Sequence, residues 1–209
     1  MKLHLGCGTV IVDGWVNVDY ALGARIQKLP VVGPIVAWSG MFSTAWSPQI
    51  VVHDLRRPFP WDDGSVDVIY TSNAIEHLKK DDGENCLREC SRVLRPGGIL
   101  RVVVPDLKGY VREYMSGRLP ARDLLSELNV LEARKLSRVR EIVALYSGGS
   151  HCCMYDETSL LAILRDFGLT PRVCRPRDSA IPDIARFEPA PEAWSQARLD
   201  RNLFVEARK

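Results

Sequence analysis

Two glycines and an aspartate near the start of the chain are residue types that could bind a nucleoside. Gly6 and Gly8 flank Cys7 at the end of one apolar run, and Asp19 ends the next. Glycines let the backbone turn sharply and let a ligand approach main-chain N–H groups without a Cβ in the way. A carboxylate placed shortly afterwards can accept both hydroxyls of a ribose. A tight turn beside a solvated aspartate is the alternative, because a lone Gly-x-Gly is a weak signal.

The four histidines could take a proton from a substrate hydroxyl near neutral pH. His4 and His53 fall inside expected strands, where packing is the usual role. His77 follows Glu76 just after a strand, and His151 stands in the glycine-flanked stretch GGSHCCMYD. We therefore take His77 and His151 as candidate general bases. The alternatives are a hydrogen-bonded orienting role for His77 and a capping or packing role for His151.

Asp106 is the third candidate catalytic residue. It follows Pro105 at the end of the run VVVP, close to where a substrate would lie. Its carboxylate could accept a hydrogen bond from a substrate hydroxyl. The same position suits the N-cap of a following helix, and capping is the favoured interpretation. Tyr110, Tyr114 and Tyr155 could line an acceptor pocket, although aromatic residues at helical spacing more often belong to the core.

The elements that must position these residues follow from apolar runs between turn signals. Seven strands are predicted, over residues 2–5, 15–19, 49–54, 66–70, 99–104, 171–175 and 202–206. Several runs are continuous rather than alternating, which is typical of strands covered on both faces. Helices are predicted over residues 82–94, about 122–146, and 156–167. This alternation predicts one α/β domain, doubly wound around a mostly parallel seven-stranded sheet.

Three segments depart from a minimal sheet of this kind. Residues 9–14 are too few for a full helix between parallel strands, so we expect a shortened first helix, reduced to a single turn or an extended bridge. Residues 21–48 and 105–150 are insertions that leave the C-terminal ends of strands, where ligands bind. We expect them to form a substrate lid or a homodimer face, with extra core as the alternative. The apolar stretch 31–46 is the candidate dimer patch.

Composition limits the classes of partner. The 209 residues include 28 basic and 26 acidic side chains, so no net field favours nucleic acid or an anionic membrane. We expect no signal peptide at the N-terminus and no apolar stretch long enough to span a bilayer. The six cysteines lack paired CxxC spacing, which favours reduced thiols. A cytoplasmic protein with a small-molecule partner is the expectation.

Four motifs follow one another in the first half of the chain, and two more follow later. They are GCG, GWVNVD, HDLRRPFPWDDGSVDVIYTSNAIEHL and LRECSRVLRPGGILRVVVPDL, then HCCMYDETSLLAILRDFGL and NLFVEARK. In this order they resemble the class I S-adenosylmethionine-dependent methyltransferases, in particular the methyltransferase-11-like group. The resemblance implies S-adenosylmethionine as the cofactor and a Rossmann-like fold. Small members of the group often accompany polysaccharide or secondary-metabolite pathways.

The resemblance assigns the opening glycines to the cofactor. Leu5, Gly6, Cys7 and Gly8 match the glycine loop beside the methionine part of S-adenosylmethionine, and Asp19 matches the ribose-binding acid. The short bridge that follows puts the help of a helix dipole at the cofactor in doubt. Main-chain contacts at the glycines do not depend on such a helix.

Two further pairs of residues match the rest of the cofactor site. Asp54 and Leu55 sit where the family holds the adenine, with the carboxylate taking the exocyclic amine. A salt bridge to a neighbouring arginine is the alternative for Asp54, because surface acids often do no more than that. Ser72 and Asn73, after the fourth strand, match positions near the sulfonium.

The resemblance also raises the question of a metal. Some ubiquinone-pathway O-methyltransferases look similar here but carry ExxEH, which binds a divalent cation through two carboxylates and the histidine. This chain has Asn73 where that motif has its first carboxylate, ahead of Glu76 and His77. Hard cations prefer several charged oxygen ligands. We therefore expect no metal.

The predicted function is methyl transfer from S-adenosylmethionine to a small molecule by in-line displacement. Oxygen is the expected acceptor atom, and a saccharide or sugar-bearing metabolite is favoured on family analogy alone. The alternatives are N- or C-methylation of a secondary metabolite and a non-catalytic module that binds S-adenosylmethionine. A nicotinamide oxidoreductase is disfavoured because the third glycine of GxGxxG and its helix are missing.

Overall fold

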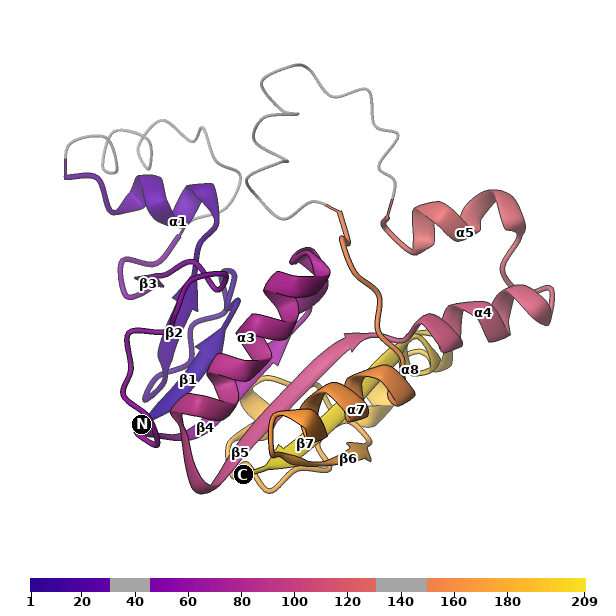
Figure 1. Cartoon of the computed structure of the whole chain (residues 1–209). Helices are drawn as coiled ribbons and strands as arrows, with labels where there is room; N and C mark the ends of the chain where they lie inside the picture. The colour runs from indigo at the N-terminus through magenta and orange to yellow at the C-terminus, as the bar shows by residue number, and fades with distance from the viewer. Residues whose placement is uncertain (31–45, 131–149) are drawn as a thin grey trace.

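The computed structural model describes residues 1–30, 46–130 and 150–209, and these form an α/β structure built on one sheet (Figure 1). The seven strands of the described chain lie in the order β3-β2-β1-β4-β5-β7-β6. They are β1 (Lys2–Leu5), β2 (Val16–Asp19), β3 (Val51–Val52), β4 (Val66–Ser72), β5 (Leu94–Pro105), β6 (Thr170–Cys174) and β7 (Asn202–Arg208). Strands β1 to β5 pair in parallel, and β7 runs antiparallel between β5 and β6. The predicted mostly parallel, seven-stranded sheet is confirmed.

Two long helices cover one face of this sheet. The described helices are α1 (Leu22–Gln27), η1 (Ile75–His77), α3 (Lys80–Val93), α4 (Leu107–Met115), α5 (Ala121–Glu127), α7 (Glu157–Asp166), η2 (Ile184–Arg186), η3 (Pro191–Ala193) and α8 (Gln196–Asp200). Helices α3 and α7 lie side by side on the sheet, and their apolar stripes share the largest core cluster with β1, β4 and β5 (Figure 1). The stripe of α3 is built from Cys86, Leu87, Cys90 and Val93, as its 3.6-residue period predicts.

The opposite face is covered by the irregular segment 175–195, which contains only the short helices η2 and η3. Its apolar side chains pack on a second cluster that includes Trp15, Tyr70 and Phe204. Phe187 stacks on the Tyr70 ring with centroids 4.3 Å apart. Since the segment has little regular structure of its own, its backbone polar groups need partners on the sheet.

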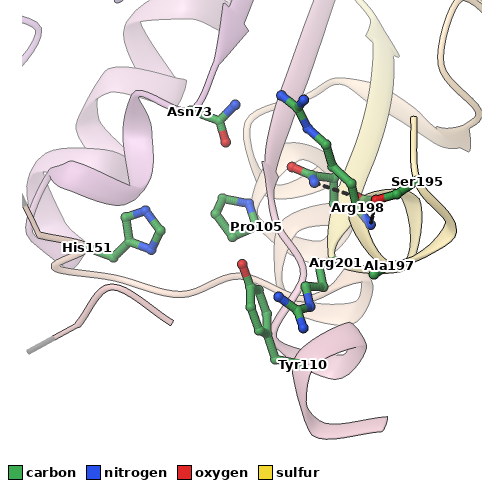
Figure 2. A pocket seen from close by; sticks show the side chains of 9 residues that line it. Asn73, Pro105, Tyr110, His151, Ser195, Ala197, Arg198 and Arg201 are labelled. Carbon is green, nitrogen blue, oxygen red and sulfur yellow. Dashed lines mark hydrogen bonds between the residues drawn. The ribbon is translucent and has the colours of Figure 1, made fainter. Parts of the chain in front are cut away.

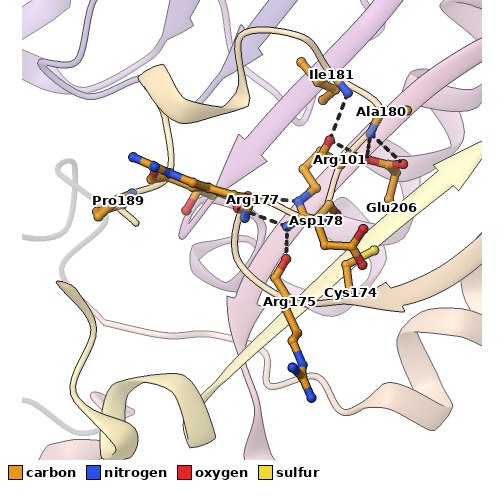
Figure 3. A network of polar contacts seen from close by, with 12 residues as sticks. Arg101, Cys174, Arg175, Arg177, Asp178, Ala180, Ile181, Pro189 and Glu206 are labelled. Atoms are coloured by element: carbon orange, nitrogen blue, oxygen red, sulfur yellow. Dashed lines mark hydrogen bonds and ion pairs between the residues drawn. The ribbon is translucent and has the colours of Figure 1, made fainter. Parts of the chain in front are cut away.

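Arg101 supplies those partners (Figure 3). Its side chain is fully buried on β5 and donates to Glu188 Oε1 at 2.9 Å and to Oε2 at 3.0 Å. The same guanidinium donates to the carbonyls of Arg175 and Asp178. Glu188 also accepts the N–H of Arg177 at 2.6 Å. A buried ion pair with its remaining hydrogen bonds satisfied fixes the path of the segment across the sheet.

The bridge between β1 and β2 contains no helix, as its length predicts. Asn17, buried on β2, takes the place of helical hydrogen bonds. Its Oδ1 accepts the N–H of Val12 at 3.0 Å, and its Nδ2 donates to the carbonyls of Val12 and Trp15 at 3.2 and 3.1 Å. One buried amide therefore holds a connection that usually needs a crossover helix.

Most elements differ from the expected ranges by one or two residues at an end, and three differ by more. Strand β3 has only two residues, and β5 begins at Leu94 because that residue pairs with Val66 before the register shifts. The helix expected over 122–146 is wrong at residues 128–130, since α5 ends at Glu127 and Asn129 adopts a left-handed φ of 54°. That conformation ends a helix. Residues 131–149 lie outside the described chain.

Several expectations fall on residues that the structure does not describe. Residues 31–45 and 131–149 make up much of the two expected insertions, so the lid, the homodimer face and the apolar patch over 31–46 stay predictions. All six cysteines are free, as expected. Among the described helices, none has the length and apolar character needed to cross a membrane.

Candidate active site

The glycine loop follows β1 and turns through two left-handed residues. Gly6 has φ 65° and Gly8 has φ 54°. A Cβ added to Gly6 would lie 2.3 Å from the Cβ of Ala74, whereas one added to Gly8 would meet nothing within 4 Å. Gly6 is therefore required by close packing against the loop after β4. Gly8 instead leaves a stretch of main chain open to a ligand.

Asp19 ties this loop to the end of β2. Its Oδ2 accepts the N–H of Gly8 at 2.8 Å, and its Oδ1 accepts the N–H of Ala21 at 2.7 Å. Each carboxylate oxygen has a second acceptor position, so Asp19 keeps the capacity to accept hydroxyl groups. The side chains of Leu5 and Cys7 are buried, and burial raises the pKa of the Cys7 thiol to about 12. These two residues can meet a ligand only through their backbone.

Asp54 forms a salt bridge with a neighbouring arginine, which was the alternative to adenine binding in the sequence analysis. Arg56 donates Nε to Oδ1 at 2.8 Å and Nη2 to Oδ2 at 2.7 Å. The hydrogen bond to this guanidinium holds the pKa of Asp54 below its usual range. Because the Arg56 side chain is 51% exposed, a ligand could displace it from the carboxylate. The Leu55 side chain is buried in the main core.

Strand β4 ends where Ser72 and Asn73 redirect the chain. Asn73 has a left-handed φ of 49°, and its N–H donates to the carbonyl of Val103 at 2.9 Å. Its Nδ2 donates to the hydroxyl of Ser72 at 3.1 Å. This turn leads into η1 and leaves the Asn73 side chain exposed at the end of the sheet.

A pocket of about 430 Å³ opens at the C-terminal ends of β4 and β5, a size that suits a small molecule. Figure 2 shows Asn73, His151 and the hydroxyl of Tyr110 around one space beside Pro105. Arg198 and Arg201 line the pocket from its other side. Of the predicted site residues, Asn73 and His151 thus meet in this pocket.

Glu76, His77 and His151 come together next to the pocket. The carbonyl of Glu76 accepts the N–H groups of Cys152 and Cys153 at 2.7 and 3.0 Å, which docks the 150–153 segment onto η1. The rings of His77 and His151 lie 5.1 Å apart between centroids. The two histidines that the sequence could only propose separately are therefore neighbours.

The electrostatics of this cluster are dominated by burial. Glu76 is fully buried, and neither of its carboxylate oxygens has a hydrogen-bond partner among the described residues. Burial raises the pKa of Glu76 to about 8. Burial also lowers the pKa of His77 and of His151, and the neighbouring His77 lowers the latter further. All three side chains therefore favour their neutral forms at pH 7.

Asp106 acts as the N-cap of α4, the alternative that sequence reasoning favoured. Its Oδ1 accepts the N–H of Lys108 at 3.1 Å, and Arg112 lies 3.3 Å from its Oδ2. Burial raises the pKa of the Asp106 carboxyl. Asp106 is not among the residues that line the pocket. Of the candidate tyrosines, Tyr110 lines the pocket, while Tyr155 is buried in the core.

Sequence reasoning missed the contribution of α8 to the pocket. Ser195 caps this helix by accepting the N–H of Arg198 at 3.2 Å, and Ser195, Arg198 and Arg201 all line the pocket. A serine before a short helical stretch is a readable N-cap signal. The position of α8 beside β5 could not be predicted from the sequence, because it depends on the antiparallel insertion of β7 between β5 and β6.

Residues 3–102 match the family model described as "Methyltransferase domain". They span β1 to most of β5, and with these strands the glycine loop, Asp19 and the His77 segment. The match covers just under half of the chain, and this half is similar to the class I S-adenosylmethionine-dependent methyltransferases. S-adenosylmethionine is the cofactor that this similarity implies.

One curated relative shares this similarity. A Mycolicibacterium smegmatis protein described as "Probable S-adenosylmethionine-dependent methyltransferase" is 28% identical over 147 residues, which are 70% of this chain and 51% of that protein. The chain thus spans about half the length of this relative.

Two solved methyltransferases share the fold of the chain. The Archaeoglobus fulgidus structure matches with a TM-score of 0.52 at 12% identity and covers 100% of this chain and 85% of its own. The Mesorhizobium loti structure matches with a TM-score of 0.51 at 18% identity and covers 100% and 90%. At such identities the likeness concerns the fold alone.

Proposed function

We propose that the chain transfers the methyl group of S-adenosylmethionine to a hydroxyl of a small molecule, with a saccharide or sugar-bearing metabolite as the favoured acceptor. The observation that carries the proposal is the close approach of Gly6 to Ala74. It sets the glycine loop against the segment that runs from Asn73 to His77. A cofactor on the loop and an acceptor in the pocket would then be neighbours, as in-line transfer requires.

The cofactor fits the residues present at the loop. The open side of Gly8 admits the close main-chain approach that a nucleoside needs, and Asp19 retains acceptor positions for the two ribose hydroxyls. In this proposal Gly6, Cys7 and Gly8 contact the cofactor through their backbone. The cofactor site also includes Leu5, Asp54, Leu55, Ser72 and Asn73. The ion pair between Arg56 and Asp54 breaks when adenine binds.

The proposed transfer is a single displacement. The bond between the sulfonium sulfur and its methyl carbon breaks, a bond from the acceptor oxygen to that carbon forms, and S-adenosylhomocysteine leaves. The hydroxyl proton passes to a general base. His151 is the favoured base because it lines the pocket and its lowered pKa keeps it neutral. His77 is the second candidate, and Asp106 positions α4 and its Tyr110.

The lining of the pocket supports a hydroxyl-rich acceptor. Asn73, Ser195 and Asn202 offer amide and hydroxyl groups, and the Tyr110 hydroxyl lies beside them. Such groups hydrogen-bond sugars in both donor and acceptor roles. N- or C-methylation of a secondary metabolite remains the alternative within the enzyme class, and cofactor binding without chemistry is the alternative outside it.

Calorimetry followed by a transfer assay tests the proposal. S-adenosylmethionine and S-adenosylhomocysteine should each bind in a 1:1 ratio, and Asp19→Asn should weaken binding at least ~10-fold by removing half of the carboxylate acceptors. Asp62→Asn, at an exposed acid outside the loop, is the matched control. A labelled methyl donor is then offered with a panel of saccharides, phenols and amines.

Each result of the two assays has one meaning. Transfer to saccharide hydroxyls, reduced by His151→Ala, supports the proposal. Transfer to amines with normal turnover in His151→Ala favours N-methylation instead. Binding without transfer to any acceptor supports the non-catalytic module, and failure to bind either nucleoside overturns the cofactor site as well.

A further inference from the structure

We propose that Glu76, His77 and His151 form a binding site for one divalent transition-metal ion at the inner end of the pocket, with Zn²⁺ as the best match. One ligand atom from each side chain lies within 4.8 Å of the other two. No result above assigns a metal to this protein. The proposal rests on the cluster alone and does not depend on methyl transfer.

The unpaired carboxylate is the first observation that points to a cation. Glu76 is fully buried and both of its oxygens lack partners among the described residues. Two other buried carboxylates are satisfied: Glu188 accepts from Arg101, and Glu206 accepts from Arg172, Ser179 and Ala180. A buried polar group without a partner costs free energy and requires an explanation, such as an ion.

The orientation of the histidines is the second observation. The Nδ1 of His77 lies 3.2 Å from the carbonyl of Ser150, which holds the Nδ1–H tautomer and frees the Nε2 lone pair. Metal-bound histidines are commonly held in this way by a carbonyl on the far side of the ring. The Nδ1 of His151 is buried and has no partner within the described chain. Each ring therefore has a nitrogen available to a metal.

The donor set selects the kind of metal. Two imidazole nitrogens and one carboxylate oxygen form the three-ligand set of catalytic zinc sites, which keep a fourth position open. Magnesium and calcium prefer all-oxygen sites and are disfavoured. Ligand atoms about 2.1 Å from a tetrahedral Zn²⁺ lie about 3.4 Å apart. The three side chains must therefore close in by about an ångström, which small side-chain rotations provide.

The expectation of no metal counted only ligands inside the ExxEH motif, and His151 was not among them. The docking of the 150–153 segment on Glu76 supplies it. Because His151 also lines the pocket, the open coordination position would face a bound acceptor. A hydroxyl at that position would ionise more readily, since a bound Zn²⁺ lowers the pKa of an oxygen ligand. With zinc bound, His151 would act as a metal ligand, and the role of general base proposed above would belong to the metal-free protein.

Zinc titration of the full chain tests the site. The protein is stripped with a chelator, dialysed, and titrated with Zn²⁺ against a chromogenic competitor, with no methyl donor present. We expect one equivalent per chain, and a loss of affinity of at least ~100-fold in Glu76→Gln and in His151→Ala, more than the loss of a supporting residue causes. Excess Mg²⁺ should not displace the zinc.

Two control variants separate this cluster from other donors. His53→Gln removes a histidine outside the cluster, and Cys152→Ser/Cys153→Ser removes the neighbouring thiols; both should keep full affinity. Circular dichroism checks the folding of every variant, and His77→Gln replaces any that fails to fold. Absorption of the Co²⁺ complex should lack the charge-transfer band of a thiolate ligand.

Three outcomes would overturn the metal site. They are zinc uptake below a tenth of an equivalent, uptake that persists in Glu76→Gln and His151→Ala, and uptake that disappears with the two cysteines. None of them depends on cofactor binding or turnover, so the proposed methyl transfer can survive the failure of this inference.

Discussion

Glu188 and Glu76 are carboxylates buried to nearly the same extent in two regions of the molecule, yet their surroundings are opposite. Glu188, beneath the irregular cover of the sheet, receives the Arg101 guanidinium and the N–H of Arg177. The Glu76 carboxylate, at the C-terminal edge of the sheet, receives no hydrogen bond from the described residues. A buried charge is stable only when it is compensated.

The two regions therefore differ in whether their buried polar groups have hydrogen-bond partners. The Arg101 network satisfies its own polar groups and stabilises the fold. The Glu76 cluster lies where ligands bind in parallel sheets and leaves its polar atoms unsatisfied. Buried polar atoms without partners favour a ligand-binding site at this position. The comparison therefore predicts that equivalent substitutions in the two regions have very different effects on stability.

The largest expected effect is that of Arg101→Leu. The change leaves the charge of Glu188 buried and the carbonyls of Arg175 and Asp178 unpaired, so the free energy of unfolding should fall by about 3–5 kcal/mol. Urea denaturation measures this loss. The double variant Arg101→Met/Glu188→Leu should recover most of it, because no lone charge is left. A loss below about 1 kcal/mol in the single variant would contradict the comparison.

Packing rather than paired charge should stabilise the edge near Glu76. Gly6→Ala forces a Cβ to within 2.3 Å of Ala74 at a left-handed φ, so we expect a loss of about 2 kcal/mol or more. Gly8→Ala is the matched control, with a similar φ but open space around it, and should cost about 1 kcal/mol. Thermal unfolding compares the two. Equal losses would show that Ala74 does not restrict Gly6.

Acid should weaken the same irregular cover through Asp183. Its carboxylate accepts from Lys2 at 2.7 Å and from the Trp15 indole at 2.9 Å, and these bonds, Lys2 foremost, lower its pKa. A lowered pKa contributes stability above pH ~4 that is lost as the pH falls through the folded-state value. The contribution should stay below about 1 kcal/mol, because both charged groups are partly exposed.

Comparing unfolding of the wild type and Asp183→Asn between pH 7 and pH 3 checks this contribution. The two curves should converge in acid, where the wild-type carboxyl is protonated. A constant difference across the range would assign the effect of the substitution to shape rather than to charge.

The smallest expected effect is that of Glu76→Gln. With its pKa raised to about 8, Glu76 is mostly neutral at pH 7 and has no described partner to lose, so the free energy of unfolding should change by less than about 1 kcal/mol. Urea denaturation in the presence of a chelator measures it. A loss as large as that of Arg101→Leu would mean that Glu76 is compensated after all.

Much of the fold could be predicted because its signals are local. Continuous apolar runs marked the strands, and the short 9–14 bridge excluded a full helix there. The end of α5 was missed because the left-handed turn at Asn129 leaves no trace in hydrophobic periodicity. Arg101 stands in the apolar run ILRVVV, but nothing in the sequence identifies Glu188 as its partner.

The candidate site was predictable only in parts. The glycine loop and Asp19 are close in sequence, so their spacing showed that they belong together. The meeting of Glu76 with His151 depends on main-chain hydrogen bonds between segments far apart in the chain. No spacing rule reports such a contact. The cofactor and catalytic roles of these residues stay predictions until the assays above are made.

The helix-free bridge between β1 and β2 has a consequence for how the chain folds. The space beside β1 is filled by residues from near the other end: Phe187 packs on His4, and Arg186 donates to the carbonyl of Asp13 at 2.8 Å. Strand β1 is therefore synthesised long before the segment that covers its outer surface. Contacts between residues so far apart in the chain slow folding. Until they form, the apolar surface of β1 is exposed and can aggregate with other chains.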